Sequence, residues 1–573
     1  MGEHRNLIIA IIISIVVMIF YPFFYTYISP PPMVPVESTT GTGSDAPTAP
    51  DDQPSDTAAT ASVMRERADV LADVPRVPIE TARVAGSVSL VGGRIDDLIL
   101  NDYRETVDPS SPRIVLLSPA GTEAAYYGEF GWVAADGATP VPTAETLWEA
   151  SDDRLTPSTP LVLTWDNGAG LVFTREIALD DNYLFTVTQS VANNGDVPVT
   201  LYPYGLISRH GTPETLGFFI LHEGLIGVLD GKLEEIDYDD VHDDGAIEMQ
   251  SPGGWLGFTD KYWLTALVPQ QSQEIAARFS HTLRDAASRY QTDYRGAGIT
   301  LAPGESGSSE NHFFAGAKEV RLLDQYESEQ GFPLFDRGVD WGWFYFLTKP
   351  IFYTLDYIFK YVGNFGVAIL LLTVLVKALF YPLANKSYRA MTKMKALTPE
   401  MKRIREQFAE DKLRQQQEMM ALYKKEKVNP ASGCLPILVQ IPVFFALYKV
   451  LFVTIEMRHA PFFGWIQDLS APDPTSWMNL FGLLPYDVPE LGFFNIVSIG
   501  IWPLIMGLTM WLQMRLNPTP PDPTQAKIMA ALPFVFTFML GHFAAGLVIY
   551  WAWNNTLSIA QQRLIMWRMG VKP

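Results

Sequence analysis

One lysine lies within an otherwise apolar stretch of the chain. Lys377 interrupts the run 365–383, and at 1.5 Å per helical residue it lies about 18 Å from one end and about 9 Å from the other. A lysine in the middle of a bilayer costs roughly 2.5–3.5 kcal/mol. Its side chain must therefore either extend to the nearer lipid headgroups or face a wet cavity inside a helical bundle. In such a cavity an unpaired cation attracts an anionic or polar partner.

Polar side chains in the same run and in later apolar runs could line this cavity. Thr373 lies one turn before Lys377 on the same helix face, and Gln440 stands between two prolines of a later run. The last run carries polar residues spaced so that they share one helix face, and a polar stripe in a membrane helix must meet protein, water or a polar guest. The stripe consists of Tyr550, Asn554, Ser558 and Gln561. None of these runs contains an acidic residue that could pair with Lys377.

Catalytic chemistry finds little support. The chain has no Walker loop, no GxSxG and no HExxH, and the pair His222-Glu223 lacks a second histidine. Thr373 and Lys377 could form a nucleophile and base, but a threonine at this position usually bonds its own helix backbone. The single cysteine, Cys434, excludes a disulfide scaffold and a CxxC metal or redox motif. We therefore expect no enzyme, no metal and no cofactor.

These residues must be positioned by membrane-spanning helices. The first apolar run is long enough to cross a bilayer and lacks a small-x-small ending, which favours an uncleaved anchor over a signal peptide. A tight hairpin joins the last two runs. The six candidate spans cover residues 7–28, 365–383, 434–455, 493–514, 528–543 and 546–567.

Charge divides the 573 residues into two parts and predicts their orientation. Residues 29–340 contain 19 Lys and Arg against 49 Asp and Glu, whereas the rest has 23 against 14. The segment 384–433 holds 12 basic residues, while 456–492 holds one, Arg458. By the positive-inside rule, both termini and the basic loops are cytoplasmic and the acidic part lies outside. The net charge of −21 argues against sequence-specific nucleic-acid binding.

The acidic part predicts a tether followed by an all-β sandwich. Residues 30–80 are rich in Pro, Thr, Ser, Ala and Asp, which is typical of a disordered linker. Strands 161–165 and 171–177 flank an Asp-Asn-Gly turn, as in a hairpin, and strands 183–191 and 197–207 continue the meander. The acidic stretch 234–244 lacks the ligand spacing of an EF-hand, so we expect a solvated loop rather than a calcium site.

Two further segments are expected to touch the membrane surface. The aromatic segment 341–362 predicts an interfacial amphipathic helix with a possible break at Pro350; a buried core helix is the alternative. In 384–433, Thr398 is expected to cap a helix that is followed by a second helix over 413–427. This hairpin either touches lipid headgroups or docks a partner. Its candidate contact residues are Lys402, Arg403, Arg405, Met420 and Tyr423.

Several ordered stretches together resemble the YidC family of membrane protein insertases. They are Asn364–Gly366 through Lys377 to Tyr381–Leu383, Met394 through Gln417–Tyr423, Val428–Pro430 through Gly433–Pro436 and Gln440–Pro442, and Gly546–Trp551. The resemblance implies a bacterial inner-membrane insertase and chaperone for nascent membrane proteins, acting alone or with the Sec translocon and its accessory SecDF. It also implies that the ribosome or targeting machinery meets the cytoplasmic basic loops, and that a hydrophilic groove surrounds one cation.

That cation would be Lys377, where arginine is common in the family, so charge is kept but a bidentate fork is lost. In this interpretation, substrates leave the groove past Trp551 into lipid. The expected divisions are an anchor (1–28), a disordered linker (29–80), a periplasmic β-supersandwich (81–325), a connecting and interfacial segment (326–362), and a core of five transmembrane helices (363–573) with the cytoplasmic helical hairpin 384–433.

Two other functions remain open on the residues alone. A secondary transporter would use a cationic midplane site such as Lys377, but inverted repeats and broken helices are not evident in the later runs. A carbohydrate-acting enzyme on a membrane anchor would need convergent carboxylates or histidines in the β domain, and residue spacing reveals none.

The distribution of basic residues predicts the topology directly. Reporter fusions or cysteine-accessibility mapping in cells should place 384–433 in the cytoplasm and 81–325 outside the inner membrane. If both segments were found on the same side, the six-span arrangement would be wrong.

Overall fold

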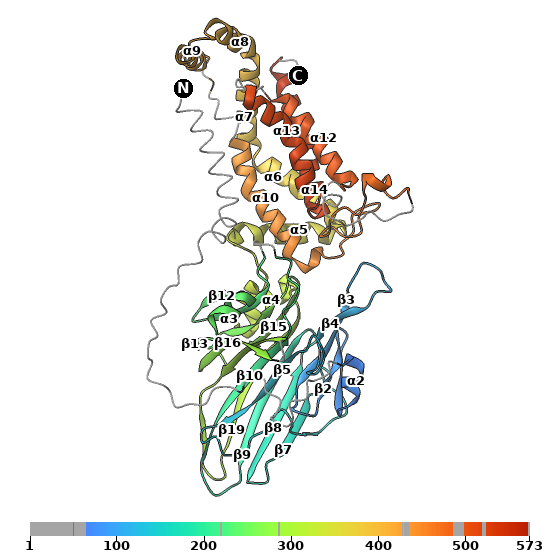
Figure 1. The fold of residues 1–573 in the computed structure, drawn as a ribbon, viewed down its shortest axis with the longest axis vertical. Helices are drawn as coiled ribbons and strands as arrows, with labels where there is room; N and C mark the ends of the chain where they lie inside the picture. Colours follow the sequence, from blue (N-terminus) through green and yellow to red (C-terminus); the bar gives the residue numbers. More distant parts are fainter. Residues whose placement is uncertain are drawn as a thin grey trace.

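The computed structural model describes residues 50, 65–217, 221–284, 287–426, 428, 435–484, 498–517 and 523–570. A β-rich half and a helical half lie end to end, with helix α5 (Tyr345–Val362) across the junction (Figure 1). The expected anchor 1–28 and residues 29–49 and 51–64 of the expected linker lie outside the described residues. The prediction of a disordered linker up to residue 80 is wrong at its end, because residues 67–72 form a helix and residues 76–80 form a strand that pairs within the β-rich half.

The β-rich half contains two antiparallel sheets. The ten-stranded sheet runs in the order β1-β2-β3-β5-β10-β17-β16-β13, with β4 paired to β3 and β18 to β10. Its strands are β1 (Arg76–Glu80), β2 (Val84–Ser89), β3 (Ile95–Arg104), β4 (Arg113–Leu117), β5 (Tyr126–Ala134), β10 (Val199–His210), β13 (Ile247–Pro252), β16 (Glu274–Arg284), β17 (Ala287–Arg295) and β18 (Ile299–Leu301). A short helix, α2 (Arg67–Ala72), precedes them.

The second sheet has nine strands in the order β12-β11-β14-β15-β19-β9-β8-β7-β6. They are β6 (Glu149–Ala150), β7 (Leu161–Asp166), β8 (Leu171–Leu179), β9 (Leu184–Asn193), β11 (Gly224–Leu229), β12 (Lys232–Ile236), β14 (Trp255–Thr259), β15 (Trp263–Val268) and β19 (Ser306–Ala317).

The core lies between the two sheets because alternate side chains of each strand point inward. On β8 the inward positions include Phe173 and Ile177, both fully buried. Arg175 shares this inward face, and its guanidinium donates to the carbonyls of Gly93 (2.7 Å) and Phe130. Two of the guanidinium nitrogens are thus tied to backbone oxygens, while the buried Nε has no hydrogen-bond partner among the described residues.

Several strand predictions are confirmed and others are wrong. The predicted hairpin forms between β7 and β8, with Asp166 opposite Val172 beside the turn. β10 does not continue the meander: it pairs with β5 and β17 in the other sheet, so the turn after β9 is a crossing between layers. The acidic stretch 234–244 is not a loop. It contains the end of β12 and helix α3 (Tyr238–Asp244), whose Tyr238 and Val241 are buried.

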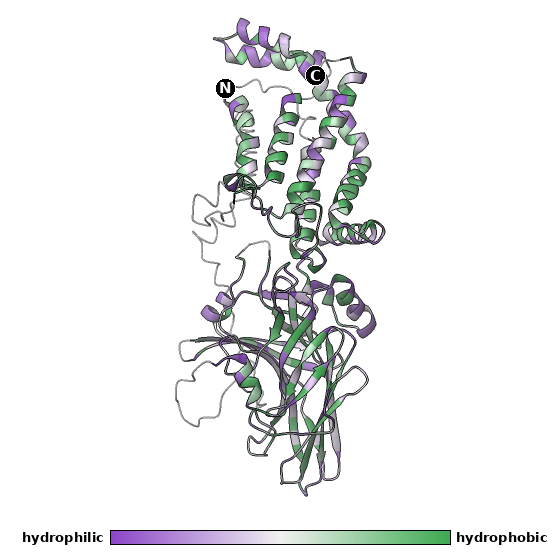
Figure 2. Cartoon of the chain, turned by 90° about the vertical axis from the view of Figure 1, so that its right-hand side faces the viewer, coloured by the Kyte–Doolittle hydropathy of each residue, from purple (hydrophilic) through white to green (hydrophobic). Residues whose placement is uncertain are grey.

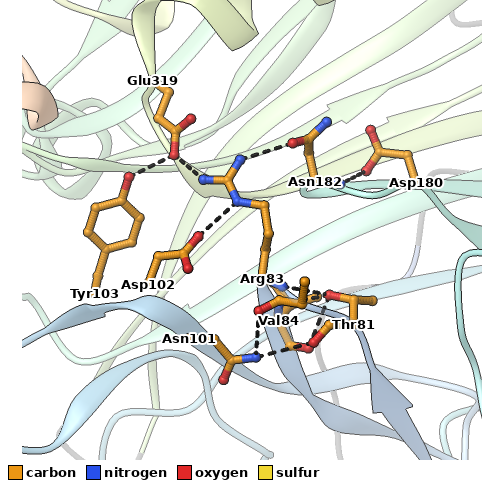
Figure 3. A network of polar contacts seen from close by, with 10 residues as sticks. Thr81, Arg83, Val84, Asn101, Asp102, Tyr103, Asp180, Asn182 and Glu319 are labelled. Carbon is orange, nitrogen blue, oxygen red and sulfur yellow. Dashed lines mark hydrogen bonds and ion pairs between the residues drawn. The ribbon is translucent and has the colours of Figure 1, made fainter.

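A polar network near the junction joins the sheets to the start of the helix that follows β19 (Figure 3). Arg83 pairs with Glu319 and with Asp102 (2.9 Å), and it donates to Asn182 at the β8–β9 turn (2.9 Å). Tyr103 donates to the same Glu319 carboxylate at 2.7 Å. Glu319 directly precedes helix α4 (Val320–Gln330), so this network holds the start of that helix against the sheets.

The connecting segment is tied to the helical half by buried or half-buried ions. Lys349 of α5 pairs with Asp324 of α4 (2.7 Å) and with Asp336 (2.8 Å) of the short helix η1 (Phe335–Gly338). Beyond α5, Glu456 accepts a hydrogen bond from the Val320 amide at 3.0 Å, and Lys449 pairs with Asp340 at 2.7 Å. The two halves are therefore joined by specific polar contacts in addition to the chain itself.

Helix α5 passes through Pro350 without the break that the sequence allowed there. One face buries Ile351, Phe352 and Leu355. The remaining surface exposes aromatic side chains, including Phe346 and Tyr361. The helix therefore has one face packed in the core, as the alternative prediction held, and another face suited to a membrane interface.

The helical half comprises a bundle and an outlying helix pair. The elements are α6 (Phe365–Leu379), α7 (Tyr381–Ala396), α8 (Thr398–Gln407), α9 (Lys412–Lys425), α10 (Leu435–Val453), η3 (Ile455–Met457), η4 (Trp477–Asn479), α12 (Ile501–Leu516), α13 (Pro523–Met539) and α14 (Ala545–Arg568). Figure 2 shows hydrophobic colouring along the bundle helices and hydrophilic colouring on the pair farthest from the β-rich half.

No single helix in the described part of the chain meets a length and hydropathy test for crossing a membrane; the bent pair α6–α7 does so jointly. The expected span 365–383 is interrupted because α6 ends at Leu379 and α7 departs at 70°. Pro382 lies in the first turn of α7, where its missing N–H and fixed φ suit a new helix start rather than a continuation. Thr398 is not a cap: α8 includes it and begins after Leu397, which follows α7 directly.

Lys318 provides a test of the packing beside the junction. Its ammonium donates to Thr259 Oγ1 at 2.9 Å in a fully buried position, and burial lowers the pKa of Lys318 from 10.5 to about 8. Replacing Lys318 with Met removes the cost of burying the charge, so the free energy of unfolding at pH 7 should rise by about 2–3 kcal/mol.

The sign of the pH dependence follows from the lowered pKa. Between pH 8 and 10.5 the unfolded chain keeps a proton that folded Lys318 has released, so native stability rises with pH and the advantage of Lys318→Met shrinks. Calorimetric melting at pH 7 and at higher pH measures this difference. An equal or less stable variant at pH 7 would show that the buried ammonium is stabilising.

Candidate functional site

The bend between α6 and α7 leaves a small cavity beside α10. The side chains that line it come from these three helices and from Phe380 between α6 and α7; they are Val376, Lys377, Phe380, Leu383, Ala384, Tyr388, Gln440 and Val443. Its volume of about 30 Å³ is enough for about two water molecules, by the usual requirement of about 10–15 Å³ each. The cavity therefore has room for water beside a charge but is too narrow for a polypeptide as it stands.

Lys377 is half-buried at this cavity and is held by a neutral partner. Its Nζ donates to Ser558 Oγ at 2.8 Å, and Ser558 Oγ donates in turn to the Asn554 carbonyl at 2.8 Å. Among the residues that the structure describes, no carboxylate lies within ion-pair distance of Lys377. The location of Lys377 in the last turn of α6 places the cation near the negative end of the helix dipole.

A second polar contact joins α10 to α14. Gln440 Nε2 donates to the hydroxyl of Tyr550, which is buried. Tyr550 and Ser558 are eight residues apart and so lie on one face of α14. The structure thus brings Lys377, Gln440, Tyr550 and Ser558 together.

Two further members of the α14 stripe have unsatisfied polar atoms. Within the described part of the chain, Asn554 Oδ1 and Gln561 Nε2 are buried without a hydrogen-bond partner. Buried polar atoms are rarely left unpaired, so water or a guest molecule is expected to meet them.

The remaining predicted groove residues lie elsewhere. Thr373 is buried and donates to the Ile369 carbonyl at 2.7 Å, so its hydroxyl is used within α6, and it does not line the cavity. Trp551 packs edge-on against Phe444 of α10, with ring centroids 4.6 Å apart, and also lies near Phe536.

Some polar positions were missed by the reasoning from sequence. Asn555 donates to Thr509 of α12 at 3.4 Å, and Gln562 donates to the Leu516 carbonyl at 3.2 Å. Their spacing of seven residues is the signal that would have revealed a second polar face of α14 directed at α12. Tyr388 lines the cavity from α7, and no pattern marked it because α7 itself was not predicted as a separate helix.

The predicted hairpin residues occupy the outlying pair α8–α9. Tyr423 of α9 contacts Met401 of α8, with the hydroxyl 4.0 Å from the sulfur, and Gln415 donates to the Arg405 carbonyl at 3.1 Å. The side chains of Lys402, Arg403 and Met420 are exposed, while those of Arg405 and Tyr423 are half-buried. The pair therefore presents positive charge and one exposed methionine to its surroundings.

An acidic cluster at the junction does not resemble a metal centre. Asp324, Glu327 and Asp336 have ligand atoms within 4.8 Å of one another. Lys349 already bridges two of these carboxylates, which explains the cluster as an ion-pair network.

Two protein families match consecutive parts of the chain. The family described as "YidC periplasmic domain" matches residues 76–354, and the family described as "60Kd inner membrane protein" matches residues 357–572. A protein named membrane protein insertase YidC from Bradyrhizobium diazoefficiens is 52% identical over 100% of this chain and 97% of its own length. Its namesake from Methylorubrum extorquens is 57% identical over 88% of this chain and 83% of its own length.

Solved structures give looser matches. A crystal structure of an active YidC insertase with the first transmembrane domain resolved is 18% identical and covers 87% of this chain and 92% of its own, with a TM-score of 0.36. A galactose mutarotase-like protein from Lactobacillus casei is 11% identical and covers 42% of this chain and 100% of its own, with a TM-score of 0.29.

The contact between Gln440 and Tyr550 can be tested by a double-mutant cycle. Hydrogen bonds between membrane helices contribute about 0.5–1.5 kcal/mol. Tyr550→Phe and Gln440→Leu should therefore each lower the free energy of unfolding of the detergent-solubilised protein by that order, which thermal melting measures. Because each substitution removes the same contact, the double variant should lose less than the two single losses combined. Full additivity would mean that the two side chains act independently.

Proposed function

The chain belongs to the YidC family of membrane protein insertases, and we propose that it inserts membrane proteins through the polar site around Lys377. The observation that carries the proposal is a cation at a small wet cavity with no carboxylate partner among the described residues. Such a site suits a passing polar segment better than a permanently bound ion.

We further propose six membrane spans, with both termini and the α8–α9 hairpin in the cytoplasm and the β-rich half in the periplasm. The distribution of basic residues supports this orientation. The end-to-end arrangement in Figure 1 also supports it, because α8–α9 and the β-rich half lie at opposite ends of the apolar bundle. The bend after α6 then lies toward the cytoplasmic side.

The proposed mechanism lowers the cost of moving polar flanks into the membrane. A nascent segment first meets the basic surface of α8–α9, and its polar flank then enters the cavity. There Lys377, Ser558 and the unpaired Oδ1 of Asn554 replace part of its hydration, which reduces the desolvation penalty. The apolar segment passes into lipid, and its burial supplies the driving force.

The small volume requires that the helices separate during this step. The cavity wall is formed by α6, α7 and α10, and the hydrogen bonds Lys377–Ser558 and Gln440–Tyr550 join α6 and α10 to α14. Neither bond is an ion pair, so each can be exchanged for a hydrogen bond to a substrate without leaving a carboxylate unpaired. The basic hairpin suits the ribosome or targeting machinery as a partner, and cooperation with the Sec translocon and SecDF is part of the same proposal.

Charge substitutions at Lys377 test the electrostatic role. Lys377→Arg should retain activity, Lys377→Ala should fail on substrates with acidic translocated flanks, and Lys377→Glu should be worse because it repels those flanks. Protease protection of an acidic flank measures translocation, with the abundance of each variant checked. Normal translocation by both the Ala and the Glu variant would remove Lys377 from the mechanism.

A change at Ser558 offers a matched pair within the same experiment. Ser558→Asp places a carboxylate beside the Lys377 ammonium and neutralises it, whereas Ser558→Asn adds similar volume without charge. Translocation of acidic flanks should fall with Asp and persist with Asn. Equal loss with both would indicate that packing, rather than positive potential, is what the site requires.

A further inference from the structure

The segment between α10 and α12 exposes an unusual amount of apolar surface. Residues 461–484 contain no lysine or arginine, and their only charged residues are Asp468 and Asp473. Phe463, Leu480 and Leu483 are 63%, 52% and 82% exposed. Large apolar side chains gathered in one segment indicate a partner that covers them.

This segment is folded around a buried carboxylate. Asp473 Oδ1 accepts from Trp465 Nε1 (3.1 Å) and from the Thr475 amide (3.0 Å), while Oδ2 accepts from the Trp502 amide (2.9 Å) in the first turn of α12. The carboxylate thus caps α12 in place of a local side chain. A Cβ on Gly500, the residue before α12, would lie 2.4 Å from Asp473 Cγ, so glycine is required for this approach.

The other contacts of the segment fix it to the end of the bundle. The carbonyls of Leu469 and Ala471 accept from the amides of Gly546 (3.0 Å) and Ala545 (2.7 Å) at the start of α14, and Ile466 and Leu469 are buried. Asp468 is used within the segment, accepting from the amide and hydroxyl of Ser470 at 2.7 Å each. The exposed apolar side chains therefore belong to a segment whose backbone is held in place by these contacts.

The position of the segment identifies what covers it. It connects two helices that we propose cross the membrane, and it lies at the level of α5, at the bundle end nearest the β-rich half (Figure 1). Helix α12, which follows the segment, also exposes apolar residues, among them Leu504 and Leu508. The bilayer is the hydrophobic phase that borders that surface in an inner-membrane protein.

We infer that residues 461–484 are immersed in the outer leaflet of the bilayer, at the depth of the headgroups and upper acyl chains, as a second interfacial element besides α5. Aromatic and aliphatic side chains without cations suit this zone. Immersion would hold the outer ends of α10, α12 and α14 at one depth. Separation of the helices would then occur at the other end, around Lys377. The inference rests on the proposed topology, which the reporter mapping of 384–433 and 81–325 tests separately.

Site-specific labels on the full-length protein test the inference. In a Cys434→Ser background, single cysteines at 463, 480 and 483 receive an environment-sensitive fluorophore, and the protein is reconstituted into phospholipid vesicles. Position 508 on α12 is the lipid-facing reference. Position 283, whose leucine is 66% exposed in the β-rich half, is the aqueous reference. The quenchers are iodide in water and a nitroxide near the top of the acyl chain.

The expected result is that the nitroxide quenches labels at 463, 480 and 483 severalfold more than the label at 283, and that iodide quenches them severalfold less. Iodide quenching equal to that at 283 would overturn the inference. The same result is expected if another protein, absent from the vesicles, covers this surface in the cell. A matched pair of substitutions guards against label artefacts. Leu483→Asp should raise iodide quenching at 480, and Leu283→Asp should leave it unchanged. No change with Leu483→Asp would also count against immersion.

Discussion

The helical half is organised by a positive charge that its own helices do not neutralise. Helices α6, α10, α12, α13 and α14 contain no aspartate or glutamate, yet α6 carries Lys377 near its end. Such a charge is tolerated only beside polar groups and water, so α14 must present a polar stripe, and the α6–α7 bend must leave a cavity. Ser558, Tyr550 and Gln440 therefore have an architectural role as well as the proposed functional one: they make the interior polar enough for the lysine.

The β-rich half is attached by contacts of the opposite kind. There the charges are paired: Lys349 with two carboxylates, Lys449 with Asp340, and Arg83 with Glu319. Breaking a partly buried pair leaves an uncompensated ion, which resists movement. Under the proposed function, the paired ions would hold the junction end of the bundle in place, while the unpaired Lys377 would let the opposite end open.

The acidic character of the β-rich half agrees with this division. Its carboxylates are either engaged in networks such as that around Arg83 or exposed on elements such as α3. Its surface contrasts with the basic helix pair α8–α9 at the far end of the bundle. The acidic and basic parts of the sequence thus lie at opposite ends of the molecule, and the apolar bundle lies between them.

The sequence by itself determined the all-β character of the acidic part, the β7–β8 hairpin and the presence of Lys377 among helices without acidic residues. Local periodicity, turn residues and charge counts carry that information. It did not predict the crossing of β10 to the second sheet, because strand pairing depends on partners distant in sequence. It also missed the 70° bend after α6 and the capping of α12 by Asp473, since both concern how separate elements meet. Helical spacing placed Tyr550 and Ser558 on one face of α14 and favoured a bond from Thr373 to its own helix backbone, but only tertiary packing decided that Lys377 reaches Ser558.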